Sequence, residues 1–254
     1  LVCLHYSSGY YLNPDEASLI HSASQATPWR AYVASHSHPH PPLMVLVLHL
    51  ALRLGKSVVM LRLLSGASCA AAAWLTYRWA RRTHGQPEAL AGLVLLTFSP
   101  ALVSAACEVR QYALLLLFTC GALHLLQRFL EGKSLWVGGA YSACLYGAVL
   151  THYSAAWIAV TFAIYGTVAW AAVNPGWRVR TFWCLSLAGV AVLYVFLYFT
   201  HVRRVLASGY ARSQILGYLQ GQYFSPTDQG LVAFAGGHTA KFFAYLMGGQ
   251  LAGG

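Results

Sequence analysis

The 254-residue chain is 58% hydrophobic and only 9% charged, and its 16 basic residues outnumber its 6 acidic residues. Soluble domains carry about 25% charged residues, so this composition excludes an ordinary soluble fold and is typical of an integral membrane protein. The net charge of +10 lies mainly between apolar segments, and no basic patch interleaved with stacking aromatics is visible, which argues against a nucleic-acid partner.

The two ends of the chain suggest a piece of a longer protein. It begins at Leu1 in a short mixed stretch with no recognisable signal peptide, and it ends in Gly253-Gly254 soon after an apolar patch that begins at Phe242. We therefore expect truncation at both ends, with at least one membrane span missing upstream. The six cysteines form no CxxC pair, which favours packing over metal or redox roles: Cys3, Cys69, Cys107, Cys120, Cys144 and Cys184.

The first polar segment holds two adjacent carboxylates, Asp15 and Glu16, in a chain with few acids. An ionisable group beside a bilayer is a candidate functional group. Such a carboxylate can accept a proton from an acceptor hydroxyl, or the pair can hold a divalent cation against a phosphate. The alternative is local: Pro-Asp-Glu suits the first turn of a helix, where acidic side chains favour the helix dipole.

A histidine- and proline-rich stretch follows, and then a short apolar run. His36, His38 and His40 alternate in an extended, proline-restricted segment, so nothing in the pattern fixes a tetrahedral metal site. The run from Pro42 to Leu54 is too short to cross a bilayer. It predicts an interfacial or partly re-entrant helix.

Six runs with few charges are long enough to predict membrane spans, at residues 57–79, 89–107, 111–130, 135–151, 154–173 and 181–201. Residues 135–173 contain no Asp, Glu, Lys or Arg, and we place a break at Thr151-His152-Tyr153. His49, His124 and Arg62 lie in or near these apolar helices, where packing or snorkelling accounts for them.

The loops predict an orientation. One set of connections carries seven basic residues: Arg78, Arg81, Arg82, Arg128, Lys133, Arg178 and Arg180. The opposite set carries only Arg110 between the first and last spans, so the positive-inside rule places the first set in the cytoplasm. The unusual polar residues then converge on the outer face: Asp15, Glu16, the histidine tract, Glu108, Arg110, Tyr112, His152, Tyr153, Arg203 and Arg204. Arg203 and Arg204, after the last span, fall on the outer side and count against this orientation, because the positive-inside rule favours basic residues in the cytoplasm.

The short segment from Glu108 to Tyr112 joins two predicted spans. Arg110 could clamp a phosphate with two parallel hydrogen bonds, or it could form a local pair with Glu108 that caps two helix ends. His152, at a hairpin tip, is either a polar interface residue or part of a cleft.

Taken in order, these residues resemble the integral-membrane glycosyltransferases of the GT-C class, which include the protein O-mannosyltransferases and the lipid A aminoarabinose transferase. The resemblance covers about residues 10–170 and rests on six short motifs: Pro14-Asp15-Glu16, His40-Pro41-Pro42-Leu43, Arg62-Leu63-Leu64-Ser65, Ser99-Pro100, Glu108-x-Arg110-x-Tyr112 and His152-Tyr153. No resemblance is found after about residue 205.

The resemblance implies a transferase, hexosyl or pentosyl, that takes a sugar from a polyprenyl-phosphate donor on the outer face of a membrane, as in the bacterial inner membrane facing the periplasm. It assigns the catalytic carboxylate to Asp15, with Glu16 supporting it or binding a divalent cation, the one cofactor left open. Arg110 is the first candidate to neutralise the leaving phosphate, and Arg203 or Arg204 the second. The remaining substrate-binding candidates are His40, Glu108, Tyr112, His152 and Tyr153.

We therefore predict an all-α, polytopic helix bundle in three parts. Residues 1–56 form an outer-face loop with the acidic motif and interfacial helix, residues 57–201 the transmembrane core, and residues 202–254 an outer-face segment and the start of a further span. The expected partners are the lipid-linked donor, membrane lipid and an unidentified glycan, lipid or protein acceptor. The rival functions are a transporter or flippase of a lipid-linked or anionic solute, and a non-catalytic scaffold. Transporters place ionisable groups near mid-bilayer in repeated halves, whereas these acids lie at span ends and no repeat is visible.

Overall fold

The computed structural model describes residues 12–55, 57–173, 176–209, 213, 217, 224–225 and 230–246. Within these residues the chain is helical and contains no strand, which confirms the predicted all-α polytopic bundle. The expectations for Cys3 and for both chain ends fall outside the described residues.

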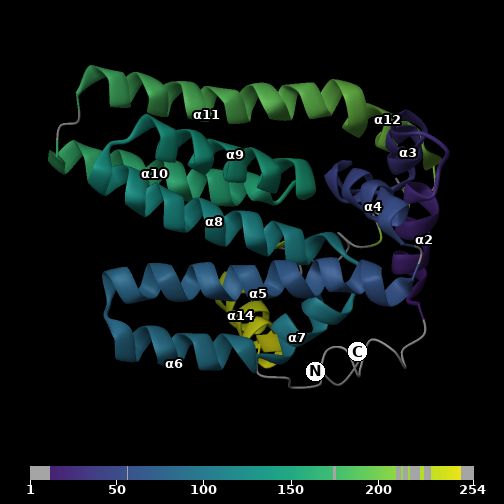
Figure 1. Cartoon of the computed structure of the whole chain (residues 1–254), viewed down its shortest axis with the longest axis horizontal. Helices are drawn as coiled ribbons and strands as arrows, with labels where there is room; N and C mark the ends of the chain where they lie inside the picture. Colours follow the sequence, from purple (N-terminus) through teal and green to yellow (C-terminus); the bar gives the residue numbers. More distant parts are fainter. Residues whose placement is uncertain are drawn as a thin grey trace.

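A bundle of long helices makes up the body of the protein, and its members run roughly along one axis (Figure 1). Helix α8 packs between α5 and α9, while α6 and α7 cover α5 and α11 covers α9. The helices are α5 (Val58–Thr83), α6 (Gln86–Thr97), α7 (Pro100–Cys107), α8 (Gln111–Gly132), α9 (Leu135–Thr151), α10 (Ala155–Val173) and α11 (Trp177–Leu197).

A layer of shorter helices covers one end of this bundle, on the right in Figure 1. We call it the cap layer; it consists of α2 (Pro14–Ala23), α3 (Pro28–Ala34), η1 (Ser35–Ser37) and α4 (Leu43–Leu54). Helix α4 matches the short apolar helix predicted from Pro42 to Leu54. Its buried Met44 and Leu48 pack with Leu19 of α2, Leu61 of α5 and Leu114 of α8. Burying each such side chain contributes about 1.5–3 kcal/mol, so the cap layer is joined to the bundle by an apolar core.

The predicted spans are all helical, but they differ in length. Helices α5, α8 and the continuous stretch Trp177–Ala207 are long and apolar enough to cross a membrane, and α6 with α7 would make a fourth span. Helix α9 has 17 residues, a rise of about 26 Å against a hydrocarbon core of about 30 Å, and the apolar part of α10 is equally short. By length and composition, three or four of the six predicted spans are therefore long enough to cross a membrane among the described residues.

The predicted span over residues 89–107 is not one continuous helix. It is divided into α6 and α7, whose axes are bent by 57°. Pro100 has no backbone N–H, and the residue before a proline avoids the helical conformation. Ser99 accordingly adopts extended angles of φ −63° and ψ 125°, and the helix ends there.

The break predicted at His152 is confirmed, because α9 ends at Thr151 and α10 begins at Ala155. Close packing within the bundle follows from small residues, as expected between helices in a bilayer. A Cβ on Gly147 of α9 would lie 2.8 Å from the Phe118 ring of α8, so glycine allows these two helices to approach. Tyr141 and Trp183 stack with ring centroids 5.7 Å apart and fill the space between α9 and α11.

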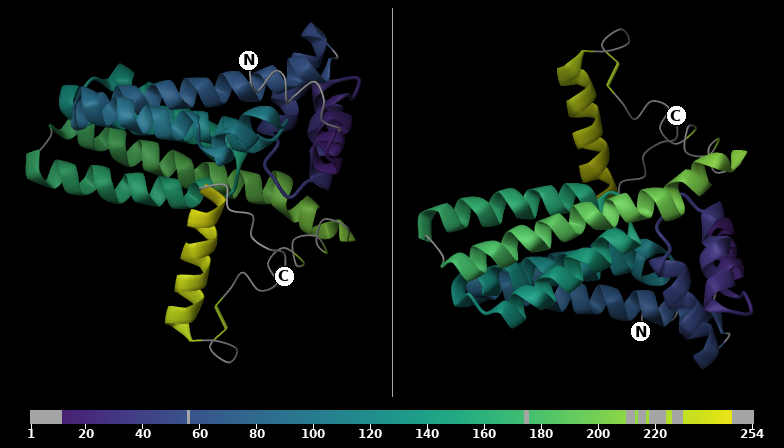
Figure 2. Two further views of the ribbon diagram at one scale, coloured as in Figure 1. Left: turned by 90° about the horizontal axis from the view of Figure 1, so that it is seen from below. Right: turned by 90° about the horizontal axis from the view of Figure 1, so that it is seen from above.

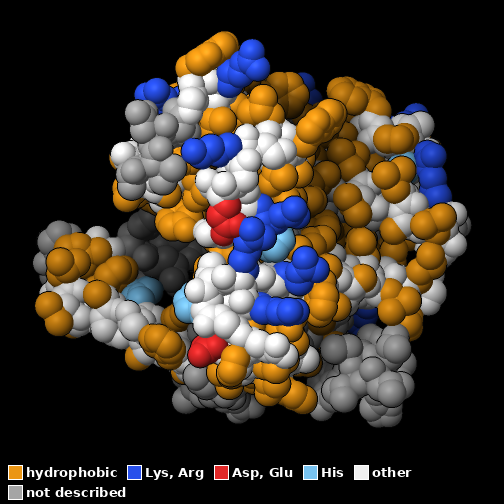
Figure 3. Space-filling view, turned by 60° about the vertical axis from the view of Figure 1, so that its left-hand side comes forward, with side chains coloured by type: hydrophobic (Ala, Val, Ile, Leu, Met, Phe, Trp, Pro, Cys, Tyr) orange, Lys and Arg blue, Asp and Glu red, His pale blue; other side chains and the backbone are white. Residues whose placement is uncertain are grey.

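The opposite end of the bundle carries the seven basic residues that the sequence grouped together, and we call it the basic end. They lie at the last turns of α5 and α8 and the first turn of α11. Figure 3 turns the left-hand side of Figure 1 forward, and Lys and Arg side chains gather near the middle of that face between hydrophobic areas. Trp136 and Trp177 are 92% and 70% exposed at this end, as expected of an interfacial aromatic belt.

The chain beyond α11 continues through a π-helical turn, Tyr198–Val202, into α12 (Arg203–Ala207). Helix α14 (Leu231–Leu246) contacts α7 and projects away from the bundle axis, as Figure 2 shows in two further views. The helix begins eleven residues before the apolar patch noted at Phe242, because Leu231 to Ala235 are also apolar.

Candidate active site

The acidic motif begins helix α2 with a capping box. The Asn13 side chain accepts a hydrogen bond from the Asp15 N–H at 3.2 Å, and the Glu16 carboxylate accepts one from the Asn13 N–H at 3.1 Å. The helix-cap interpretation of this motif is therefore confirmed as local geometry. The cap also turns the two acids to different sides: the Asp15 side chain is 58% exposed, whereas that of Glu16 is 1% exposed.

Glu16 is held by a buried arginine. The guanidinium of Arg62 in α5 donates from Nε and Nη2 to the two carboxylate oxygens at 3.3 and 3.0 Å. The backbone N–H of Val109 donates to Oε1 of Glu16 at 2.7 Å. Burial raises the pKa of Glu16, but the hydrogen bonds from Arg62, Val109 and Asn13 outweigh it and leave the pKa below its usual value.

This pair corrects the sequence analysis at Arg62. Arg62 was attributed to packing or snorkelling, yet its side chain is 4% exposed and bound to Glu16. A charge at this depth needs a partner, because neither lipid nor solvent can stabilise it. Both oxygens of Glu16 accept hydrogen bonds from the protein, and no group of three or more His, Cys, Asp or Glu side chains in the described ranges is arranged to hold a metal ion.

Asp15 forms an ion pair with Arg110, which is 95 residues away in the sequence. The predicted proximity of these two residues is confirmed. Arg110 also forms the local ion pair with Glu108 that the sequence suggested: its Nε lies 3.4 Å from Oε2 of Glu108. The Ser104 hydroxyl donates to the other oxygen of Glu108 at 2.8 Å. The guanidinium, on a 23% exposed side chain, therefore lies between two carboxylates from different segments.

Next to this ionic cluster, three of the predicted residues gather through their rings. His40, just before α4, lies 5.1 Å from His152 between ring centroids, and the Tyr112 ring lies 5.8 Å from the same imidazole. The Ser154 N–H donates to Nδ1 of His152 at 3.1 Å, which fixes the imidazole at the hairpin tip. The segments before α4, at the start of α8 and between α9 and α10 thus meet at one place.

A second ring cluster includes residues that the sequence analysis did not select. His201 of the π-helical turn is fully buried and 5.1 Å from His36 between ring centroids. Its ring nitrogens lie 2.8 Å from the Tyr153 hydroxyl and 3.2 Å from the Ser35 hydroxyl. The Tyr32 hydroxyl donates to the Thr200 carbonyl at 3.1 Å. The cluster joins the cap layer to the π-helical turn that follows α11. The sequence feature that could have identified His201 is its position at the end of an apolar span.

The remaining two candidates lie farther along the last span. Arg203 packs over the Phe199 ring at 5.8 Å, and Arg204 is near enough to His36 to lower its pKa, after the larger effect of burial. Neither arginine forms an ion pair in the part of the chain that the structure describes. The Tyr153 hydroxyl hydrogen-bonds to His201, and burial raises the pKa of Tyr153, so the neutral hydroxyl is part of the contact between the cap layer and the bundle.

The chain is thus a bundle of apolar helices with a carboxylate and a guanidinium in contact at one end. A family model described as dolichyl-phosphate-mannose-protein mannosyltransferase matches residues 39–202. No curated protein and no solved structure matches the chain. The match covers more than half of the sequence, so the chain belongs to this family and is an integral-membrane glycosyltransferase of the GT-C type. The match begins after α2, and therefore does not include Asp15 or Glu16.

Arg62→Met should strongly destabilise the protein, because it leaves the Glu16 carboxylate buried without a cation. Breaking a buried pair in this way costs about 3–5 kcal/mol. The thermal unfolding temperature in detergent micelles should fall sharply, and adding Glu16→Gln should restore part of it, since glutamine keeps an acceptor for the Val109 N–H. Arg82→Met removes an exposed pair with Glu131 and should have little effect. Equal unfolding temperatures for Arg62→Met and the parent would contradict this.

The cap layer should loosen as the pH falls. Burial, followed by the charges of His152, His38, Arg110 and His201, lowers the pKa of His40 to about 3. Burial likewise lowers the pKa of His36, His38 and His152. A histidine with a depressed folded-state pKa binds more protons when unfolded, so its stabilisation is present above about pH 6.5 and is lost progressively below it.

Proteolysis of the cap layer and the unfolding temperature, followed from pH 7.5 to pH 5, should both show this loss. Glu16 remains ionised over that range, since its pKa lies below the usual value. His40→Gln should reduce the pH dependence, whereas His84→Gln, in an exposed residue after α5, should not. A pH dependence that is the same in His40→Gln as in the parent would disprove the assignment.

Proposed function

We propose that the protein transfers a sugar from a polyprenyl-phosphate donor to an acceptor hydroxyl at the membrane face covered by the cap layer. The observation that carries this proposal is the contact between the exposed Asp15 carboxylate and the Arg110 guanidinium at the end of the bundle. Family membership supports the reaction class, and the seven basic residues at the opposite end support an outer, periplasmic position for the cap layer in a bacterial inner membrane.

In this proposal Asp15 is the general base. It accepts the proton of the acceptor hydroxyl, whose oxygen forms a bond to the anomeric carbon of the donor sugar. The bond between that carbon and the phosphate oxygen breaks, and the polyprenyl phosphate leaves with the electron pair. Arg110 neutralises the charge that develops on the phosphate through charge-assisted hydrogen bonds.

The pairing of Asp15 with Arg110 describes the protein before the donor arrives. The donor phosphate would take the place of the Asp15 carboxylate on the guanidinium and so release Asp15 toward the acceptor. Arg110 keeps its position during this exchange, because Glu108 holds it from the other side and Ser104 holds Glu108. Glu108 thus acts as a positioning residue for the cation.

Neutral groups complete the proposed sugar site. The lowered pKa values of His40 and His152 keep both imidazoles uncharged near neutral pH, so they can hydrogen-bond sugar hydroxyls without competing for the phosphate. The buried Nδ1 of His40 has no hydrogen-bond partner among the described residues. Tyr112 supplies an adjacent aromatic face. Arg203 and Arg204 are the second candidates for the cation that neutralises the leaving phosphate. In that role, the end of the last span would approach the donor.

Asp15→Asn should abolish most of the transfer activity. The amide keeps the size and hydrogen-bonding capacity of the side chain but cannot take the proton, and general-base contributions are typically about 10²–10⁴-fold. Arg110→Lys should also reduce transfer, because a point charge cannot reproduce two parallel hydrogen bonds to phosphate. Transfer of label from a polyprenyl-phosphate sugar is measured with the full-length protein at matched expression. Glu88→Gln, an exposed acid at the start of α6, is the control. Undiminished transfer by Asp15→Asn would leave that residue as a helix cap only.

The orientation can be tested separately by cysteine labelling in a cysteine-free background. A cysteine at position 15 or 108 should react with an impermeant reagent from outside intact cells, and one at position 84 should not, because the seven basic residues favour the cytoplasm. Labelling of position 84 with protection of position 15 would reverse the topology.

A further inference from the structure

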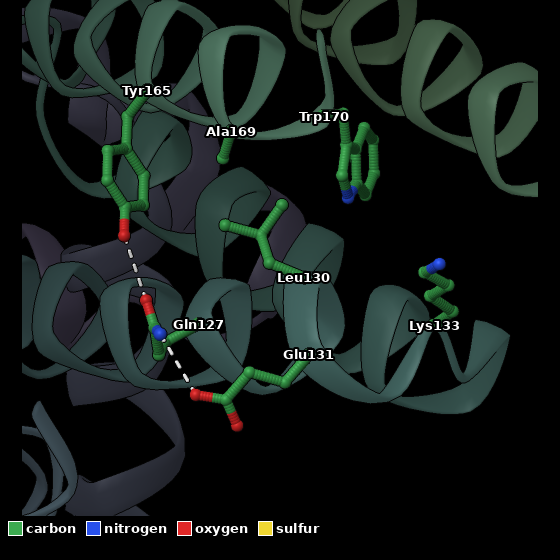
Figure 4. Close-up of a pocket in the computed structure, with 7 residues that line it drawn as sticks. All are labelled: Gln127, Leu130, Glu131, Lys133, Tyr165, Ala169 and Trp170. Carbon is green, nitrogen blue, oxygen red and sulfur yellow. Dashed lines mark hydrogen bonds between the residues drawn. The ribbon is translucent and has the colours of Figure 1, made fainter. Parts of the chain in front are cut away.

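A cavity of about 370 Å³ opens at the basic end, on the side of the bundle away from the cap layer. It lies between the last two turns of α8 and the last two turns of α10 (Figure 4). Its volume is within the range of about 300–1,000 Å³ that is usual for small-molecule sites. None of its lining residues belongs to the proposed active site, so the proposed sugar transfer does not account for this cavity.

One wall of the cavity consists of polar side chains that are hydrogen-bonded to one another. The Tyr165 hydroxyl donates to Oε1 of Gln127 at 2.9 Å, and Nε2 of Gln127 donates to Glu131 at 2.9 Å. Glu131 also pairs with Arg82, which balances its charge. The Lys133 ammonium is different, because it forms no ion pair within the described part of the chain. It therefore supplies an uncompensated positive charge at the edge of the cavity.

The other wall is apolar and leads toward the lipid-facing side of the bundle. Leu130, Ala169 and the buried Trp170 line it, and Figure 4 shows Leu130 between the polar wall and Trp170. On α10, Ile164 and Val168 are 61% and 66% exposed, so an apolar helix surface continues beside the cavity. A cavity with a cation at one edge and an apolar wall toward the lipid matches a molecule with a charged head and a hydrocarbon tail.

The position of the cavity supports a membrane lipid as that molecule. The exposed Trp136 and Trp177 mark this end of the bundle as an interface. Arg128, Arg78 and Arg82 act electrostatically on His124 of α8 against the opposing charge of Glu131, so positive charges outnumber negative charges around it. Basic pockets between membrane helices on the positively charged side are suited to anionic headgroups.

We propose that this cavity binds the phosphate headgroup of an anionic phospholipid from the leaflet at the basic end, with Lys133 as its ion-pair partner and the acyl chain along α10. The site would connect the lipid composition of one leaflet to the α8–α10 contact. It is independent of the sugar transfer proposed at the other end.

Native mass spectrometry of the purified full chain can count and rank bound lipids. The wild-type protein should retain one phosphatidylglycerol more tightly than phosphatidylcholine, and Lys133→Gln should weaken phosphatidylglycerol about fivefold, since one basic group near a lipid surface has roughly that effect. Ala169→Phe fills the cavity without changing charge and should also remove the bound lipid. Unfolding temperatures measured in phosphatidylcholine show whether each variant is folded. If one of the two variants does not fold, the other still tests the proposal.

The control is Arg178→Gln, which removes one positive charge from the same end at a residue packed on Trp177 outside the cavity. It should bind phosphatidylglycerol as the parent does. Unchanged binding in Lys133→Gln or in a folded Ala169→Phe would overturn the proposal. An equal loss in Arg178→Gln would overturn it in favour of a diffuse basic surface. Stabilisation by inorganic phosphate as strong as that by phosphatidylglycerol would overturn the lipid assignment in favour of a free anion.

Discussion

The candidate site depends on one interaction, the buried pair of Glu16 and Arg62. Removing two charges from water costs several kcal/mol for each ion, and the cost is recovered only when geometry and further hydrogen bonds are good. Here the carboxylate accepts four hydrogen bonds, two from Arg62 and one each from Val109 and Asn13. The donors belong to α5, to the segment before α8 and to the start of α2 itself. Few other positions of α2 could satisfy Glu16, so the pair fixes where this helix docks.

That docking determines how Asp15 is presented. Successive residues of a helix point about 100° apart, so a buried Glu16 directs its neighbour toward the surface. The same carboxylate holds the Val109 N–H, and the following residue is Arg110. Two consecutive residues of α2 therefore contact two consecutive residues of the segment before α8. The helix cap and the proposed chemistry, which the sequence presented as alternatives, are parts of one arrangement, because the cap directs Asp15 toward Arg110.

The histidines have a complementary effect. His36, Tyr32 and Ser35 of the cap layer meet His201 of the last span, and His40 meets His152 at the tip of a helical hairpin. These contacts are aromatic and hydrogen-bonded rather than ionic, so they join the cap layer to the bundle without adding charge beside Arg110. The layer is held over the helix ends while the region around the guanidinium keeps neutral polar groups.

Much of this arrangement was predictable from the sequence, and the exceptions have physical reasons. Apolar run lengths placed the helices, and the scarcity of acids identified Asp15, which does contact Arg110. The bend at Ser99 was signalled by Pro100 but was overlooked because the apolar run continues through it. Arg62 was missed because an isolated arginine in an apolar helix also fits snorkelling, and only the folded chain supplies Glu16. His201 was missed because its cap-layer partners Ser35 and His36 lie about 165 residues earlier.

The charges at the cap end give the proposed reaction an order. Asp15, Glu16 and Glu108 face Arg62 and Arg110, so the cluster carries one more negative than positive charge. A donor phosphate entering this cluster adds negative charge and takes Arg110 from Asp15. The binding of the donor would therefore separate Asp15 from its cation and leave the carboxylate free to meet the acceptor hydroxyl. Glu16 would not respond in the same way, because Arg62 and two backbone N–H groups hold its charge inside the protein.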